Sequence, residues 1–135
     1  MRIWLITVGE PLPIGDSDDR LLRTGILADL LVAGGHQVVW WTSTFDHFKK
    51  KYFFYKDSTV NINDNFKIEL LHSIAYSKNV SLSRIINHYG IARKFAYYSE
   101  REQAPDLILC SLPTLELSVE ATKFGKIRGI PVILD

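Results

Sequence analysis

The first 41 residues place two short apolar runs on either side of a helical pattern, and this arrangement constrains the fold more than any other feature. Residues 3–8 have the length and composition of a strand that is buried on both faces, and residues 38–41 form a second short apolar strand. Between them, apolar residues recur at helical spacing up to Gly34-Gly35, a pair that favours a helix end because the C-terminal cap often needs a positive φ. The order strand, helix, strand predicts a right-handed crossover between two parallel strands.

The loop between the first strand and this helix runs from Gly9 to Gly15 and is the first candidate for function. Its glycines lack the G-x-G-x-x-G spacing of a dinucleotide site. The loop is nevertheless longer than a strand-to-helix connection needs. Ligands of such folds gather at the carboxyl ends of the strands, so we expect one wall of a site here. The acidic run 16–19 is predicted to open the helix, with Asp16 or Ser17 as its cap.

The rest of the chain continues the alternation of strands and helices. Apolar runs predict strands over residues 66–72, 107–110 and 130–134, the first of them an edge strand, and helical spacing predicts helices over 81–103 and 117–128. These elements predict an α/β fold, a doubly wound, Rossmann-like parallel sheet of about five strands in the order 3-2-1-4-5. The second helix is expected to bury one face, formed by Leu82, Ile85, Ile86, Tyr89, Ala92 and Ala96.

Length and composition exclude several classes of protein. A chain of 135 residues is one domain by size, and its net charge of +1 without a long basic tract argues against nucleic acid as a partner. The single cysteine, Cys110, is expected in the core and cannot form an intrachain disulfide, which fits a reducing compartment. The sequence has neither a secretory leader pattern nor an apolar stretch of membrane-spanning length, so a cytoplasmic location is expected. Because the chain stops at the end of an apolar strand, we expect a longer protein.

Residues 45–56 combine aromatic side chains with lysines. Six aromatic residues occur between Phe45 and Tyr55, and four lysines are interleaved with them or follow at Lys56. Three interpretations remain open. The aromatic side chains pack on the sheet edge while the lysines stay in water, the segment contacts an anionic membrane surface, or it contacts a sugar or lipid acceptor. The polar residues 57–65 that follow predict an exposed loop or hairpin.

Further polar candidates lie at strand ends and on the second helix. The histidines lack the spacing of metal ligands, so no metal site is predicted. Arg84 and His88 are one turn apart on one helix face, for which a solvated surface is the simpler interpretation. Ser111 and Thr114 follow the fourth strand, but without the G-x-S-x-G form of a nucleophile elbow.

Taken in order, five stretches resemble the N-terminal domain of a GT-B glycosyltransferase of family 4. They are the opening M-R-I-W-L-I-T-V with its glycine loop, A-D-L-L-V-A-G-G-H-Q-V-V-W-W, W-T-S-T-F-D-H-F-K-K, A-P-D-L-I-L-C-S-L-P-T, and the final G-I-P-V-I-L-D. In that family the A-x-x-L-x-x-x-G-H-x-V form recurs after the first helix, and the G-I-P-V-x-x-D ending leads into the rest of the acceptor domain and then a second Rossmann domain. The resemblance spans essentially the whole chain.

The resemblance implies a two-domain enzyme that transfers a hexose from a nucleotide-sugar donor to a glycan or lipid-linked acceptor in surface polysaccharide synthesis, with retention and without a metal. Residues 1–135 would form its acceptor-side domain, truncated before the second domain that mainly binds the donor, and no other cofactor is implied. Residues 45–56 would lie beside the inner face of the membrane. The acceptor or cleft residues would be Gly9, Glu10, Gly15, Asp46, His47, Lys50, Arg84, His88, Ser111, Pro113 and Thr114.

No catalytic base is assigned, because the helix-capping acids Asp18 and Asp19 have a structural explanation and we expect the same of Glu10. The alternative function is a stand-alone flavodoxin-like binding or regulatory module without catalysis. A receiver-type module would need acids at the ends of the first and third strands, where this chain has Val8-Gly9 and Leu71-His72. A nucleotide-dependent epimerase or dehydrogenase would need the glycine fingerprint that the first loop lacks.

Overall fold

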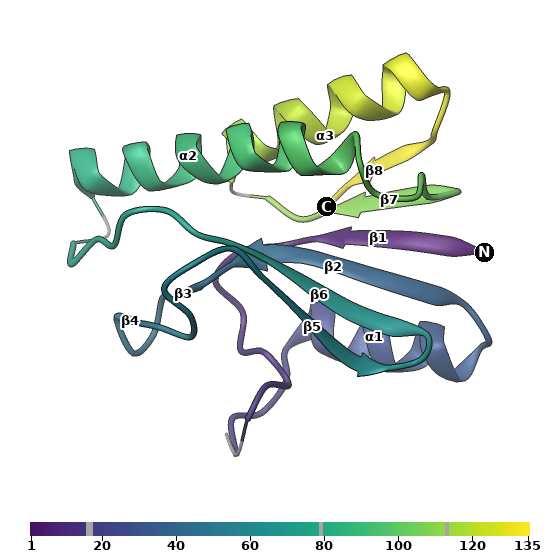
Figure 1. The fold of residues 1–135 in the computed structure, drawn as a ribbon, viewed down its shortest axis with the longest axis horizontal. Helices are drawn as coiled ribbons and strands as arrows, with labels where there is room; N and C mark the ends of the chain where they lie inside the picture. Colours follow the sequence, from purple (N-terminus) through teal and green to yellow (C-terminus); the bar gives the residue numbers. More distant parts are fainter. Residues whose placement is uncertain (16–17, 79, 113) are drawn as a thin grey trace.

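A computed structural model describes residues 1–15, 18–78, 80–112 and 114–135 of the chain. Within these residues the protein has an α/β fold, with one six-stranded sheet, a two-stranded hairpin and three helices (Figure 1). The elements in chain order are β1 (Arg2–Ile6), α1 (Arg23–Ala33), β2 (Gln37–Ser43), β3 (Phe45–Asp46), β4 (Lys51–Tyr52), β5 (Ser58–Asn63), β6 (Phe66–Leu71), α2 (Leu82–Ser99), β7 (Leu107–Cys110), α3 (Leu115–Arg128) and β8 (Val132–Leu134).

The sheet confirms the α/β class but is not the purely parallel sheet of about five strands that was predicted, because β5 adds a sixth strand beside β6. The observed order is β5-β6-β2-β1-β7-β8, and the sheet is mixed because β5 runs antiparallel to β6. The other neighbours are parallel, with Trp4 of β1 opposite Val39 of β2 and Ile108 of β7. The polar segment that predicted a loop or hairpin supplies β5, which packs Val60 and Ile62 against the core. The strand β6 is therefore covered on both sides and is not the edge strand that its sequence predicted.

Helices cover both faces of the sheet, with α1 on one face and α2 and α3 on the other (Figure 1). On the α2–α3 face, Trp4 packs edge-on against Trp41 at 5.2 Å between ring centroids and is stacked on Phe124 at 5.1 Å. Phe95 of α2 contacts the same two tryptophans. Large aromatic side chains thus fill this core, and Cys110 is buried among them as predicted.

The helix α1 starts later than predicted. It begins at Arg23, so Asp18 and Asp19 precede it, while Asp16 and Ser17 lie outside the described residues. The start of this helix is bound by a residue that is distant in the sequence. The Glu10 carboxylate accepts hydrogen bonds from the Thr24 backbone N–H at 2.9 Å and from the Thr24 hydroxyl at 2.7 Å. A carboxylate from the first loop therefore does what a local capping residue usually does.

The helix α2 buries a different face from the one that its sequence predicted. Its buried residues are Asn87, Ile91, Ala92, Phe95 and Ser99, whereas Leu82, Ile85, Ile86 and Tyr89 are exposed. The contacts of Phe95 with Trp4 and Trp41 fix this rotation. The side-chain amide of Asn87, donating to the Ile74 carbonyl, holds the same face toward the sheet. The helix also ends at Ser99 and not at residue 103.

Candidate functional site

The candidate site lies at the carboxyl edge of the parallel strands, where three segments meet. The hairpin β3–β4 follows β2 and carries His47 and Lys50 in its turn. Asp46 shapes this turn, because its carboxylate accepts hydrogen bonds from the Phe48 and Lys49 backbone N–H groups at 2.9 and 3.0 Å. Lys50 takes a left-handed conformation with φ of 53°, which an L-residue adopts at a cost. The turn thereby directs His47 and Lys50 toward the loop that follows β6.

That loop contributes Tyr76, a buried side chain at the centre of the cluster, with 6% of its surface exposed. Its hydroxyl lies 2.7 Å from His47 Nδ1, and its ring lies 5.0 Å from the Phe45 ring and 6.2 Å from the His88 ring of α2. Lys50 Nζ is 4.6 Å from the Tyr76 ring centroid, within the range of a cation–π interaction. Tyr76 thus joins the hairpin to α2.

The contacts of His47 identify its tautomer. The Tyr76 hydroxyl and Lys50 Nζ, at 3.4 Å, both approach Nδ1, and an ammonium group can only donate. We therefore assign Nδ1 as the acceptor and Nε2 as the protonated nitrogen. Burial, together with the positive charges of Lys50 and Arg84, lowers the pKa of His47, while the carboxylate of Asp46 opposes this shift. Burial raises the pKa of Tyr76, which keeps its hydroxyl protonated as a donor.

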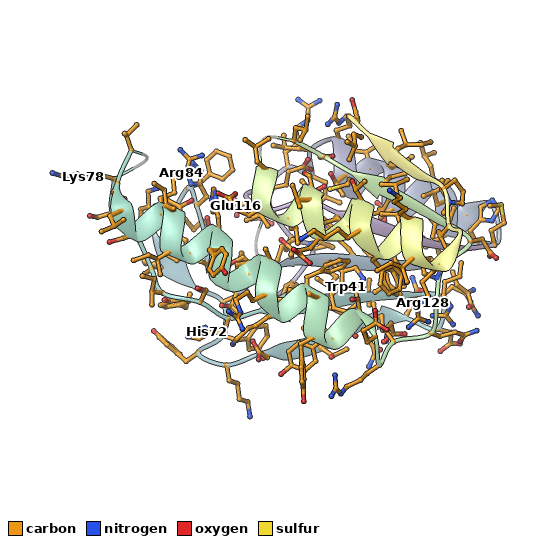
Figure 2. All side chains as sticks on the ribbon, turned by 90° about the horizontal axis from the view of Figure 1, so that it is seen from above. Trp41, His72, Lys78, Arg84, Glu116 and Arg128 are labelled. Atoms are coloured by element: carbon orange, nitrogen blue, oxygen red, sulfur yellow. The ribbon has the colours of Figure 1, made fainter. Side chains whose placement is uncertain are left out.

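His88 and Arg84 form the side of the cluster that belongs to α2. Burial and the charge of Arg84 lower the pKa of His88, and the carboxylate of Glu116 in the first turn of α3 opposes this effect. His88 Nδ1 lies 3.9 Å from that carboxylate. Arg84, His88 and Glu116 line a groove of about 270 Å³ between the starts of α2 and α3, and Figure 2 shows Arg84 and Glu116 where α3 begins beside α2.

The structure thus gathers part of the predicted site and not the rest. His47, Lys50, Arg84 and His88 belong to one cluster, and Asp46 positions it. Gly9 is close to it, because a Cβ at this position would lie 3.8 Å from the His47 Cβ; its φ is 93°.

Other predicted residues serve elsewhere. Glu10 is bound to Thr24, as a structural role requires, and Gly15 faces open space. The Ser111 hydroxyl is 3.4 Å from the guanidinium of Arg23, which pairs with Asp135 at 2.9 Å. Thr114 is buried and its carbonyl accepts from Ser118, while Pro113 lies outside the described residues.

Two members of the cluster, Tyr76 and Glu116, were not predicted. Tyr76 stands in the loop after the third parallel strand, and loops at this edge are where sites form, so its position was the available signal. Glu116 has no such signal, since an acid in the first turn of a helix is common for electrostatic reasons alone. Among the described residues, no group of three or more His, Cys, Asp or Glu side chains is placed to hold a metal ion. No helix in this part of the chain has the length and apolar character needed to cross a membrane.

Comparison with known proteins supports the fold of the chain. No family model matches the chain, and no curated protein does either. Among solved structures, the C-terminal domain (residues 78–226) of the PF1911 hydrogenase from Pyrococcus furiosus is similar, with a TM-score of 0.57 and 15% identity over 99% of this chain and 89% of that one. At this identity the likeness supports the fold alone.

The comparison contradicts the resemblance to family 4 glycosyltransferases, because the similar structure is a hydrogenase domain. The transferase function and the role in polysaccharide synthesis are therefore wrong as well, and the alternative of a stand-alone regulatory module gains no direct support. The resemblance was misleading because the matched motifs are features of a strand–helix–strand crossover and not of one family. The A-x-x-L-x-x-x-G-H-x-V form covers the end of α1 at Gly34-Gly35 and the start of β2, and many α/β proteins with such a crossover share it.

Proposed function

We propose that the carboxyl edge of the sheet binds a small ligand through a phosphate group, and that His47, Lys50, Arg84 and His88 hold that group. One observation carries the proposal: two histidines, a lysine and an arginine from separate segments converge around the buried Tyr76. The doubly wound, Rossmann-like arrangement of the sheet supports it, since such sheets bind ligands at this edge.

The chemistry of the four side chains suits a phosphate. Arg84 can offer two parallel N–H groups to two oxygens, and Lys50 can add a point charge from the hairpin. The Nε2–H of His47 is left as a donor, because Nδ1 is engaged by Tyr76 and Lys50. A doubly charged group would also favour protonation of both histidines, whose pKa values are lowered without a ligand. Glu116 would limit how many negative charges the groove accepts.

Calorimetric titration with inorganic pyrophosphate tests the proposal. The wild-type chain is expected to bind it saturably and to bind acetate at least tenfold more weakly. Arg84→Gln should weaken pyrophosphate binding at least tenfold. Arg93→Gln is the matched control, because Arg93 is exposed on the same helix, lies over the Tyr89 ring and does not line the groove of Arg84 and His88.

Equal losses in the two arginine variants, or no saturable binding by a folded wild-type chain, would overturn the proposal. Acetate binding as tight as that of pyrophosphate would overturn the assignment to phosphate. Thermal unfolding of both variants, followed by circular dichroism, checks that each remains folded.

A further inference from the structure

The first half of α2 exposes an apolar stripe. Leu82, Ile85, Ile86 and Tyr89 recur at the spacing of one helix face, and this face points away from the sheet. The side chain of Leu82 is 72% exposed, and Val80, just before the helix, is exposed as well. Single exposed apolar residues are ordinary, but a contiguous row of them marks an interaction surface.

The hairpin β3–β4 adds aromatic side chains at the same end of the molecule. Phe48 is 64% exposed, and Tyr55, just after β4, is 81% exposed. The hairpin and the start of α2 both lie at the carboxyl end of the sheet (Figure 1). Tyr76 packs against Phe45 of the hairpin and His88 of α2, so the two elements are held together. We call these two groups of exposed side chains at the carboxyl end of the sheet, Phe48 and Tyr55 from the hairpin segment and Val80, Leu82, Ile85 and Ile86 from the start of α2, the docking edge.

Basic residues outnumber acidic ones in the segments that form the docking edge. The segments 45–56 and 73–89 carry six lysines and arginines and one acidic residue, although the whole chain has a net charge of only +1. Lys49 pairs with Asp19 at 2.7 Å, and Lys50 and Arg84 belong to the phosphate site, so the basic residues particular to the docking edge are Lys51, Lys56 and Lys78. Four of these six cations belong to the hairpin segment, and Figure 2 shows a fifth, Lys78, extending beyond the N-terminal end of α2. Exposed apolar side chains therefore lie within a basic rim.

We propose that the docking edge binds the surface of a membrane that contains anionic phospholipids. Aromatic and aliphatic side chains enter the boundary between headgroups and acyl chains, while neighbouring lysines are attracted to the negative headgroups. A second copy of the chain fits less well, because two docking edges would bring like charges together. The inference does not rest on the proposed phosphate site. Val80 and Ile85 line the same groove as Arg84 and His88, but no apolar side chain of the docking edge is one of the four that hold the phosphate.

Sedimentation with lipid vesicles tests this inference. The chain is expected to bind vesicles of phosphatidylcholine and phosphatidylserine mixed three to one, and to bind pure phosphatidylcholine at least tenfold more weakly. The double variant Leu82→Ser/Ile85→Ser should lose at least tenfold in affinity. Lys51→Glu/Lys56→Glu should lose more than tenfold, since each basic residue near an anionic surface contributes about fivefold.

Matched controls come from surfaces far from the docking edge. Ile26 and Leu30 are also exposed, Leu30 at 66%, but on α1 across the sheet, and Lys123 and Lys126 lie on α3. Ile26→Ser/Leu30→Ser and Lys123→Glu/Lys126→Glu should bind vesicles as the wild type does. Pyrophosphate should release no more of the chain from the vesicles than sodium chloride does at equal ionic strength.

Three results would overturn the inference. They are equal binding to the neutral and anionic vesicles, equal losses in the control variants, and release by pyrophosphate beyond that by salt, which would assign the binding to the phosphate site. Light scattering gives a fourth test: a dimer of the wild type that Leu82→Ser/Ile85→Ser abolishes would identify a second copy as the occupant. Circular dichroism confirms that each variant is folded.

Discussion

The Tyr76 hydroxyl lies 2.7 Å from Nδ1 of His47, a residue 29 positions earlier in the chain. This contact joins the loop after β6 to the hairpin after β2, and the approach of Lys50 Nζ to the same nitrogen leaves Nε2 as the donor of the imidazole. The cluster therefore exists only in the folded chain, and its protonation state is set by groups from different elements.

Removing the charge of Lys50 is expected to raise the pKa of His47. Lys50 contributes to the lowering of that pKa through its positive charge, second only to burial, so Lys50→Gln relieves part of the shift. A titration of the histidine resonances by NMR measures it. Lys123→Gln is the control, because Lys123 pairs with Glu120 on α3. An unchanged His47 pKa in Lys50→Gln would contradict the geometry of the hairpin turn.

Anion binding is expected to tighten as the pH falls. The pKa values of His47 and His88 are lowered in the free protein, and a bound anion favours their charged forms, so binding takes up protons. The affinity should rise as the pH drops below about 6.5, the ordinary histidine pKa. Sulfate is the suitable probe because its own charge does not change there. An affinity that is flat with pH, or that falls toward acid, would count against the histidines as ligands.

Asp57 should contribute to stability above its pKa. Burial raises the pKa of this carboxyl, but hydrogen bonds from Lys94, the His72 backbone N–H and Tyr98 outweigh burial and hold the pKa below its usual value. Asp57→Asn should cost about 1–3 kcal/mol in urea unfolding at neutral pH, as for hydrogen bonds to a charged group. Since the folded pKa is depressed, this difference should be fully present above pH of about 4 and vanish as the pH falls below the folded pKa. A difference that persists in strong acid would refute the charge-based explanation.

Glu10 is expected to matter for stability and not for binding. Its carboxylate accepts from both the backbone N–H and the hydroxyl of Thr24 at the start of α1. Glu10→Ala should lower the free energy of unfolding by about 1–2 kcal/mol, the usual cost of a lost helix cap. The affinity for pyrophosphate, measured on the folded variant, should stay at the wild-type value. A loss of affinity with unchanged stability would place Glu10 in the site instead.

Most of the helices and strands of the main sheet could be predicted from the sequence, whereas the contacts between them could not. The apolar runs at β1 and β2 and the helix ending at Gly34-Gly35 predict the first crossover, because each signal is local. The orientation of α2 could not be predicted, since the helix has one apolar face at Ile91 and Phe95 and another at Leu82 and Ile85. Only the packing of Phe95 on Trp4 and Trp41 decides between them.

The same limit applies to the site. Four site residues could be predicted from their positions after a strand or on a helix, namely His47, Lys50, Arg84 and His88. Tyr76, which joins them, could not, because its contacts are with residues distant in the sequence. The start of α1 was misplaced for an equivalent reason: the acidic run before the helix suggested a local cap, while Glu10 binds the helix from the first loop. The family resemblance failed because its motifs follow from the crossover geometry.

The most direct test of the phosphate site is an NMR titration of the four histidine side chains with inorganic pyrophosphate at constant pH. We predict that His47 and His88 shift together toward the protonated form with one saturation curve. His36, whose Nδ1 lies 3.2 Å from the N-terminal amine at the opposite end of the sheet, should not move. Shifts of equal size at all four histidines, or none at His47 and His88, would contradict the account.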